Sequence, residues 1–263
     1  MGAGALIKEC WLLCRQRAPV AARSDLLMLE LHQFRHSAFC EKVRLALAFK
    51  QLSFTPIEVT PGVGQVDLYR LSGQRQVPVL VDGSEVIADS TAIALHLEQK
   101  HPDPALLPSD HALRAQVLLL EDWADTALAA GARMALVQAA ASDSVLRDGL
   151  LPEATPSPLR SLVGALPGGV LSGVGQVLDQ QVLQQLRSSL EQLTALVQAQ
   201  PYLVGDSLSL ADLAVMAQLS LIKFPSSAGS PLAGRGVAGL ADDPRLESLW
   251  LWRDRLGLQL GRP

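Results

Sequence analysis

The spacing of apolar residues differs between the first and the second part of the chain. Up to His101, short runs that alternate apolar and polar residues, typical of strands, stand between stretches with helical spacing. Beyond His111 the apolar residues recur at three- and four-residue intervals, as in the leucine stripe that begins at Leu183. We therefore expect an α/β domain followed by an all-α domain.

The first part is predicted to run strand, helix, strand, helix, strand, strand, helix. The first four elements are expected at 26–34, 38–50, 54–59 and 65–71, and the last helix at 89–100. Two short strands flank Asp82-Gly83, a strong hairpin signal because a tight two-residue turn needs residues that tolerate positive φ. Pro78 stands at the start of its strand, where the missing N–H does least damage.

Charged and proline-rich segments set the predicted domain boundaries. In order, we expect a leader at 1–26, the first domain at 27–101, a linker at 102–110 and the helical domain at 111–263. The apolar pieces of the leader are interrupted by charges such as Lys8 and Arg15, which spoils a signal-peptide core. We expect either a disordered leader or an upstream start codon, with Met28 opening the folded protein. Residues 151–175 are rich in Pro and Gly and are predicted to form an irregular excursion.

The segment from Gln33 to Arg44 joins a predicted strand directly to a predicted helix. Such a turn presents the first free N–H groups of the helix and its positive dipole end, which together stabilise an anion. Ser37 and Cys40 lie there with Ser-x-x-Cys spacing, similar to the Cys-x-x-Cys of thioredoxin-like proteins. The alternative is purely structural: Ser37 caps the helix, and Cys40 is a small buried residue.

Composition and charge narrow the class of partner. Apolar residues make up 49% of the chain but aromatic residues only 4%, so the core is built of Leu, Ala and Val, which favours helices. The net charge is −4 and there is no long basic run, so nucleic acid is not an expected partner. Every apolar stretch is broken before about 18 residues, so no membrane span is predicted.

Cysteine and histidine usage bears on redox chemistry and metals. Three cysteines provide no disulfide framework and indicate a reducing compartment, which predicts a cytoplasmic location. The five histidines do not combine with cysteines or acids at any metal-ligand spacing, and we predict no metal site.

Four motifs, taken together and in order, resemble the cytosolic glutathione transferase superfamily. They are Ser37-Ala-Phe-Cys40-Glu-Lys-Val-Arg44, Gln76-Val77-Pro78-Val79-Leu80, Asp89-Ser90-Thr91 and Gly205-Asp206-x-x-Ser209-x-x-Asp212. The resemblance spans roughly Leu27 to Arg255. It implies an N-terminal thioredoxin-like glutathione-binding domain and a C-terminal helical bundle domain. It also implies a homodimer that takes glutathione as co-substrate and a small electrophile as second substrate.

The resemblance gives the first two motifs specific roles. Ser37 falls where serine-type members face the glutathione sulfur, and a hydroxyl there favours the nucleophilic thiolate. Val77 precedes an expected cis-proline, Pro78, and its backbone is expected to pair with the glutathione cysteine. Gln76 stands where many members have Lys, so it is expected to bind the glycyl carboxylate through a neutral hydrogen bond, which is weaker than a charge-assisted one. Arg75 is a cation that can compensate.

The acid-serine pair is expected to hold the other end of glutathione. Ser90 suits the γ-glutamyl carboxylate and Asp89 the ammonium, although both residues are also good helix caps. Cys40 lacks the leading cysteine that a two-thiol redox cycle needs, so this motif alone does not support such a cycle. A different redox role, or a supporting role behind Ser37, stays open for Cys40. Asp212 is assigned a structural cap, and Trp123 either lines the substrate groove or packs.

Three functions remain open on these residues. The leading one is a glutathione transferase that activates the glutathione thiol for attack on an unknown electrophile. The second is a glutathione-dependent isomerase or thiol reductase on the same scaffold. The third is a non-catalytic binding module that uses the same fold.

Overall fold

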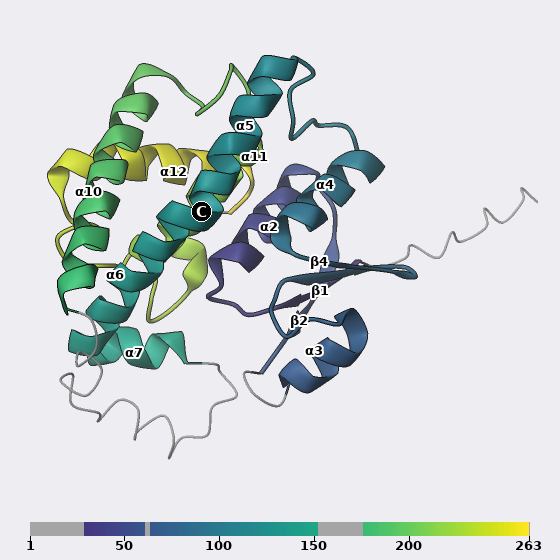
Figure 1. The fold of residues 1–263 in the computed structure, drawn as a ribbon, viewed down its shortest axis with the longest axis horizontal. Helices are drawn as coiled ribbons and strands as arrows, with labels where there is room; N and C mark the ends of the chain where they lie inside the picture. Colours follow the sequence, from purple (N-terminus) through teal and green to yellow (C-terminus); the bar gives the residue numbers. More distant parts are fainter. Residues whose placement is uncertain (1–28, 61–63, 152–175, 263) are drawn as a thin grey trace, which may run out of the picture.

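A computed structural model describes residues 29–60, 64–151 and 176–262 (Figure 1). The first part contains β1 (Leu29–Gln33), α2 (Ala38–Phe49), β2 (Phe54–Glu58), α3 (Gly64–Ser72), β3 (Val79–Asp82), β4 (Glu85–Ala88) and α4 (Ser90–Lys100). The second contains α5 (His111–Trp123), η2 (Ala124–Leu128), α6 (Ala129–Ser142), α7 (Ser144–Leu150), α10 (Gln176–Ala199), α11 (Leu210–Ile222), η3 (Ser226–Ala228), η4 (Pro244–Leu246) and α12 (Glu247–Gln259). This order confirms the predicted α/β part followed by an all-α part.

The first part is built on a mixed four-stranded sheet with strand order β2-β1-β3-β4. β1 runs parallel to β2, with Leu29 opposite Phe54, and antiparallel to β3, with Leu31 opposite Leu80. β3 and β4 form the predicted hairpin, and Gly83 supplies the positive φ of its turn. Figure 1 shows α2 and α4 on the sheet face nearer the second part, and α3 on the opposite face.

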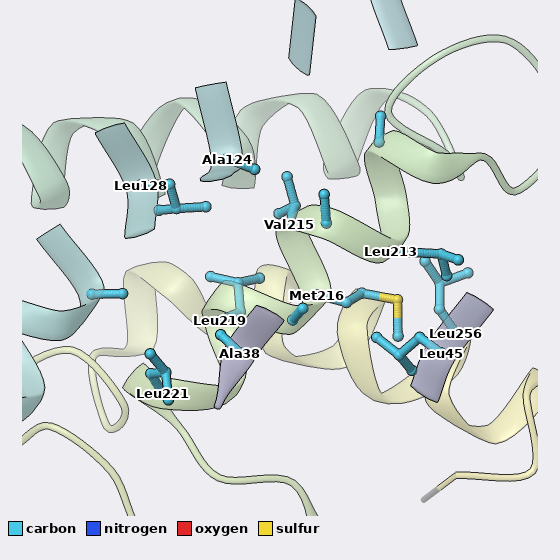
Figure 2. Packing of buried hydrophobic residues seen from close by; sticks show 14 of the residues in the cluster. Ala38, Leu45, Ala124, Leu128, Leu213, Val215, Met216, Leu219, Leu221 and Leu256 are labelled. Carbon is cyan, nitrogen blue, oxygen red and sulfur yellow. The ribbon is translucent and has the colours of Figure 1, made fainter. Parts of the chain in front are cut away.

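Helix α2 is held between the sheet and the second part of the chain. It packs against α4 and against α11, a helix that is buried along its whole length. In Figure 2, Leu45 of α2 lies beside Met216 of α11, and Ala38 lies beside Leu219. Burying a side chain of leucine size contributes about 1.5–3 kcal/mol, so this packing fixes the position of the α2 N-terminus.

Asp212 starts α11 from a fully buried position. Its Oδ2 accepts the backbone N–H of Ser209 at 2.8 Å, and its Oδ1 accepts the N–H of Leu203, also at 2.8 Å. Ser209 and Asp212 form the capping box, which confirms the structural role predicted for Asp212.

Some parts of the chain differ from the prediction or cannot be compared with it. The helix after the linker contains one π-helical turn, η2, which the apolar spacing did not indicate. The final helix begins with a short 3-10 turn at Pro244, as the proline predicted. The leader and most of the 151–175 excursion lie outside the described residues. In the described part of the chain, no helix has the length and apolar character needed to cross a membrane.

Candidate functional site

Ser37 is the N-cap of α2 and stands at the end of the turn that follows β1. Its backbone is extended, with φ −83° and ψ 123°, and its Oγ accepts the backbone N–H of Cys40 at 3.3 Å. A hydroxyl that accepts through oxygen keeps its own proton available to donate. The structural interpretation of Ser37 as a cap is therefore correct.

The Cys40 side chain points into the protein and is fully buried. Its Sγ accepts the backbone N–H of Phe34 at 3.5 Å. Burial raises the pKa of the Cys40 thiol, and the hydrogen bonds with Ser37 and Phe34 only partly oppose this. A neutral, enclosed thiol is a poor nucleophile, so the geometry favours Ser37 and not Cys40 as the residue facing a ligand.

A cavity of about 330 Å³ opens beside Ser37. Its described lining combines apolar, amide and guanidinium groups, contributed by Phe34, Ser37, Phe39, Val59, Gln65, Arg75, Gln76, Val77 and Arg133. Four of the residues singled out from the sequence thus share one cavity: Ser37, Arg75, Gln76 and Val77. Arg133 enters it from α6, in the second part of the chain.

The Val77–Pro78 peptide bond is cis, as the resemblance implied. Pro78 is buried directly before β3, while the Val77 side chain is only partly buried and contacts the small apolar cluster of Val59, Leu68 and Val79. Val77 therefore both lines the cavity and belongs to an apolar cluster.

Asp89 and Ser90 lie at the N-terminus of α4 and are not among the residues that line the cavity. The Asp89 carboxylate accepts the N–H groups of Thr91 at 2.9 Å and Ala92 at 3.0 Å. Asp89 has φ +80°, an unfavourable conformation for a residue other than glycine, of the kind that concentrates at functional sites. The Ser90 Oγ is buried and has no hydrogen-bond partner among the described residues.

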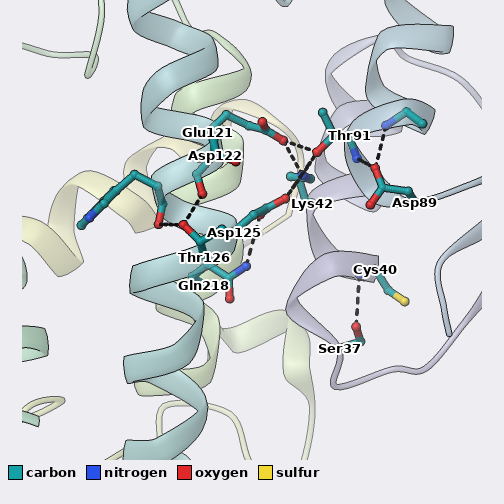
Figure 3. A network of polar contacts seen from close by, with 12 residues as sticks. Ser37, Cys40, Lys42, Asp89, Thr91, Glu121, Asp122, Asp125, Thr126 and Gln218 are labelled. Carbon is teal, nitrogen blue, oxygen red and sulfur yellow. Dashed lines mark hydrogen bonds and ion pairs between the residues drawn. The ribbon is translucent and has the colours of Figure 1, made fainter. Parts of the chain in front are cut away.

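A buried ion-pair cluster lies near the N-termini of α2 and α4 (Figure 3). The Lys42 ammonium on α2 is fully buried and donates to Glu121 at 2.6 Å, to Asp125, and to Thr91 Oγ1 at 3.0 Å. Thr91 Oγ1 in turn donates to Glu121 at 2.5 Å. Burial raises the pKa of Asp125 more than the Lys42 charge lowers it. The cluster joins α2 and α4 of the first part to α5 and η2 of the second.

Asp82, Glu85 and His96 form a second cluster, which the sequence spacing did not reveal. Their ligand atoms lie within 4.8 Å of one another, on the hairpin and on α4. The Lys100 ammonium lies 2.8 Å from Asp82 and 2.7 Å from Glu85, so a side-chain cation already bridges the two carboxylates. Burial alone would raise the pKa of Asp82, but the hydrogen bonds from Lys100 and His96 lower it overall. The arrangement is that of a salt-bridge cluster.

The sequence analysis did not identify Arg133 as a cavity residue or Lys42 as part of a buried ion-pair cluster. It left Trp123 open between lining the substrate groove and packing. Trp123 is partly buried and packs against the main core, so it is a packing residue. No motif near Arg133 indicates that its side chain lines the cavity, because tertiary packing decides which face of α6 is turned toward the cavity. Lys42 offered a signal, since a lysine two residues after Cys40 lies close to the predicted helix start.

Two family models match the chain, in the order of its two parts. The model "Glutathione S-transferase, N-terminal domain" covers residues 31–105, and "Glutathione S-transferase, C-terminal domain" covers residues 170–228. Together they take in about half of the 263 residues. The first match contains the strand, turn and helix N-termini described above.

Relatives match either one part closely or both parts more distantly. Glutathione S-transferase Z1 of Arabidopsis thaliana is 40% identical over 97 residues, which is 36% of this chain and 44% of that protein. The chain is thus matched to less than half the length of this relative. Maleylacetoacetate isomerase of Mus musculus is 29% identical over 198 residues, which is 72% of this chain and 76% of that protein.

Solved structures share the whole fold. A crystal structure of a glutathione S-transferase from Rhodospirillum rubrum F11 has a TM-score of 0.61 and 24% identity, covering 90% of this chain and 89% of that one. This likeness identifies the first part as a thioredoxin-like domain and the second as the helical domain that accompanies it. With both domain families matched in order, the chain belongs to the glutathione S-transferase superfamily.

Proposed function

We propose that the protein is a glutathione transferase that activates the glutathione thiol at Ser37 for attack on an electrophile. One observation carries the proposal: the Ser37 hydroxyl caps α2 and faces a cavity of about 330 Å³, while the neighbouring thiol of Cys40 is enclosed. The Ser37 proton donates to the glutathione sulfur, and the α2 N-terminus adds positive potential. Both effects favour the thiolate over the thiol, and the thiolate is the nucleophile.

The rest of glutathione extends along the first domain in this proposal. The Val77 backbone pairs with the cysteinyl residue, while Gln76 and Arg75 hold the glycyl carboxylate. Asp89 and Ser90 bind the γ-glutamyl end, where a buried hydroxyl without a partner and a helix N-terminus suit a carboxylate. Glutathione is the co-substrate, and we assign no metal.

The Ser37→Ala variant tests the proposal. We expect kcat/KM to fall about 10- to 1000-fold, as for loss of a single oxyanion-type donor, with little change in glutathione affinity by calorimetry. Because Ser37 is also a cap, the variant loses about 1 kcal/mol of stability. Asp110→Ala, which removes the comparable cap of α5 away from the cavity, is the matched control and retains activity.

Two outcomes would contradict this assignment. Equal activity of Ser37→Ala would move thiol activation to backbone amides or Cys40. Failure of the natural protein to bind at millimolar glutathione would leave the binding-module hypothesis.

A glutathione-dependent isomerase is the second candidate, because a relative matched over both domains is named maleylacetoacetate isomerase. A thiolate that adds to a conjugated double bond and then leaves changes its geometry and regenerates glutathione. Incubation with maleylacetoacetate distinguishes the two chemistries. An isomerised product with no loss of glutathione indicates the isomerase, and consumption of glutathione in proportion to product indicates the transferase.

We further propose a cytoplasmic homodimer. Large apolar side chains are exposed on α3 and β4, among them Val66, Tyr69 and Val86. These two elements contact each other, and exposed apolar side chains on neighbouring elements favour association. Light scattering at micromolar concentration is expected to give twice the 28.1 kDa of one chain, and a value near 28.1 kDa would contradict the dimer.

A further inference from the structure

Ser37 lines two cavities: the one of about 230 Å³ on its other side contains Glu41 and Glu58, whereas the cavity of about 330 Å³ described above has positive charge on its described lining and no negative charge. Two guanidinium groups, Arg75 and Arg133, line it, and no described aspartate or glutamate does. The two arginines come from different parts of the fold, since Arg75 precedes β3 and Arg133 belongs to α6. The cavity therefore presents cations to a ligand from the first domain and from the second.

Arg133 is an exposed residue whose described contacts leave the end of its guanidinium open to a ligand. Its guanidinium lies over the Phe39 ring, 5.7 Å from the centroid, and its Nε donates to the Ala129 carbonyl at 3.2 Å. Among the described residues it forms no ion pair, and its two terminal nitrogens have no hydrogen-bond acceptor. A stacked guanidinium with free terminal N–H groups is oriented to receive a carboxylate in bidentate fashion.

Glutathione, placed as proposed above, does not need Arg133. Its glycyl carboxylate lies toward Gln76 and Arg75, and its γ-glutamyl end toward Asp89 and Ser90. Arg133 reaches the cavity from the second domain and rests on Phe39, two residues after Ser37. It is therefore placed for the group that meets the sulfur.

We propose that the second substrate is an electrophile bearing a carboxylate, which Arg133 binds, while the aromatic or unsaturated body packs against Phe34 and Phe39. This inference rests on the proposed function. Phe34 and Phe39 provide the aromatic part of the lining, and the Arg133 charge selects against neutral electrophiles of the same shape.

A pair of matched probes isolates the charge. In 4-chloro-3-nitrobenzoate and 4-chloro-3-nitrobenzamide the reaction is the same: the thiolate sulfur forms a C–S bond to the ring carbon, and the C–Cl bond breaks as chloride leaves with the electron pair. The thiol proton passes to water, and nothing is oxidised or reduced. The probes differ in charge and are close in size.

Turnover of both probes is compared in the natural protein, Arg133→Met, Arg133→Lys and Arg114→Met. We expect Arg133→Met to lower kcat/KM for the benzoate about 10-fold or more, with the benzamide within about twofold and the glutathione KM unchanged. Arg133→Lys should recover part of the loss, since it keeps charge without the fork. Arg114 is exposed on α5, does not line the cavity, and serves as the matched control.

The same variants separate failure of this inference from failure of the proposed function. An equal fall for both probes, no fall, or a rise in glutathione KM would overturn the role of Arg133. If neither probe is turned over, calorimetry with the two S-aryl glutathione products decides. An Arg133-dependent preference for the carboxylate product upholds the inference while the transferase proposal fails, and equal affinities overturn it.

Discussion

At the scale of single residues, the difference between positions 37 and 40 decides where chemistry can occur. Ser37 lines the cavity, whereas the Cys40 thiol is enclosed and its pKa is raised by burial. A raised thiol pKa means that Cys40 stays protonated in the folded state while the unfolded chain ionises at the ordinary pKa, so the stability of the folded state falls as the pH rises from that value through the raised pKa. Both the position of Ser37 at the cavity and the raised pKa of the Cys40 thiol therefore favour residue 37 over residue 40 as the one that contacts a ligand.

The Ser37→Cys variant turns this difference into a measurement on one molecule. A thiol at 37 gains the stabilisation of the helix N-terminus, so we expect iodoacetamide at pH 7 to modify residue 37 at least about 10-fold faster than Cys40. Peptide mass spectrometry reads the two sites separately, with Cys40 as internal control. Faster labelling of Cys40 would shift the active centre by one helical turn.

At the scale of elements, α11 depends on the carboxylate that starts it. Asp212→Ala removes the acceptor of two buried backbone N–H groups, those of Leu203 and Ser209. Each unsatisfied buried donor costs about 1–3 kcal/mol, so for two donors we expect a loss of about 2–6 kcal/mol in urea unfolding. Asp110→Ala, which removes an exposed cap, should cost about 1 kcal/mol. Similar losses for the two variants would show that burial of Asp212 adds nothing.

The elements themselves were largely predictable, because their signals are local. Alternation around Leu29 and Leu31, the Asp82-Gly83 turn and the Ser209–Asp212 spacing each act within a few residues, and each appears where the sequence indicated. The Lys42 cluster was not predictable, since Glu121 lies 79 residues away in the chain. The α6 face that carries Arg133 is likewise decided by packing over long sequence separations.

At the scale of the whole molecule, Lys42 joins the two domains through buried charge. Lys42→Met leaves the Glu121 and Asp125 carboxylates without their cation, and breaking such a buried pair costs about 3–5 kcal/mol. Burial already raises the pKa of Asp125, and loss of the ammonium raises it further. A raised carboxyl pKa stabilises the folded state at low pH, and this contribution is lost as the pH rises.

Urea unfolding at pH 5 and pH 8 measures this linkage. We expect the stability deficit of Lys42→Met against the natural protein to be larger at pH 8 than at pH 5. Lys100→Met removes a surface ammonium that also bridges two carboxylates, and should show a much smaller deficit. A deficit of the same size at both pH values would mean that the cluster acts through packing alone.

The π-helical turn at Ala124–Leu128 sets the rotational phase between two sets of residues on one continuous helix. Upstream of its end lie Glu121 and Asp125, which face Lys42; downstream lies Arg133, which faces the cavity. The Ala129 N–H reaches back five residues to the Ala124 carbonyl, so the turn contains one residue more than an α-helix would use. Each residue advances a helix by about 100°, so a shortening by one residue would keep the interdomain ion pairs and rotate Arg133 out of the cavity. The number of residues in this single turn thus sets whether the second domain presents the Arg133 cation to the cavity.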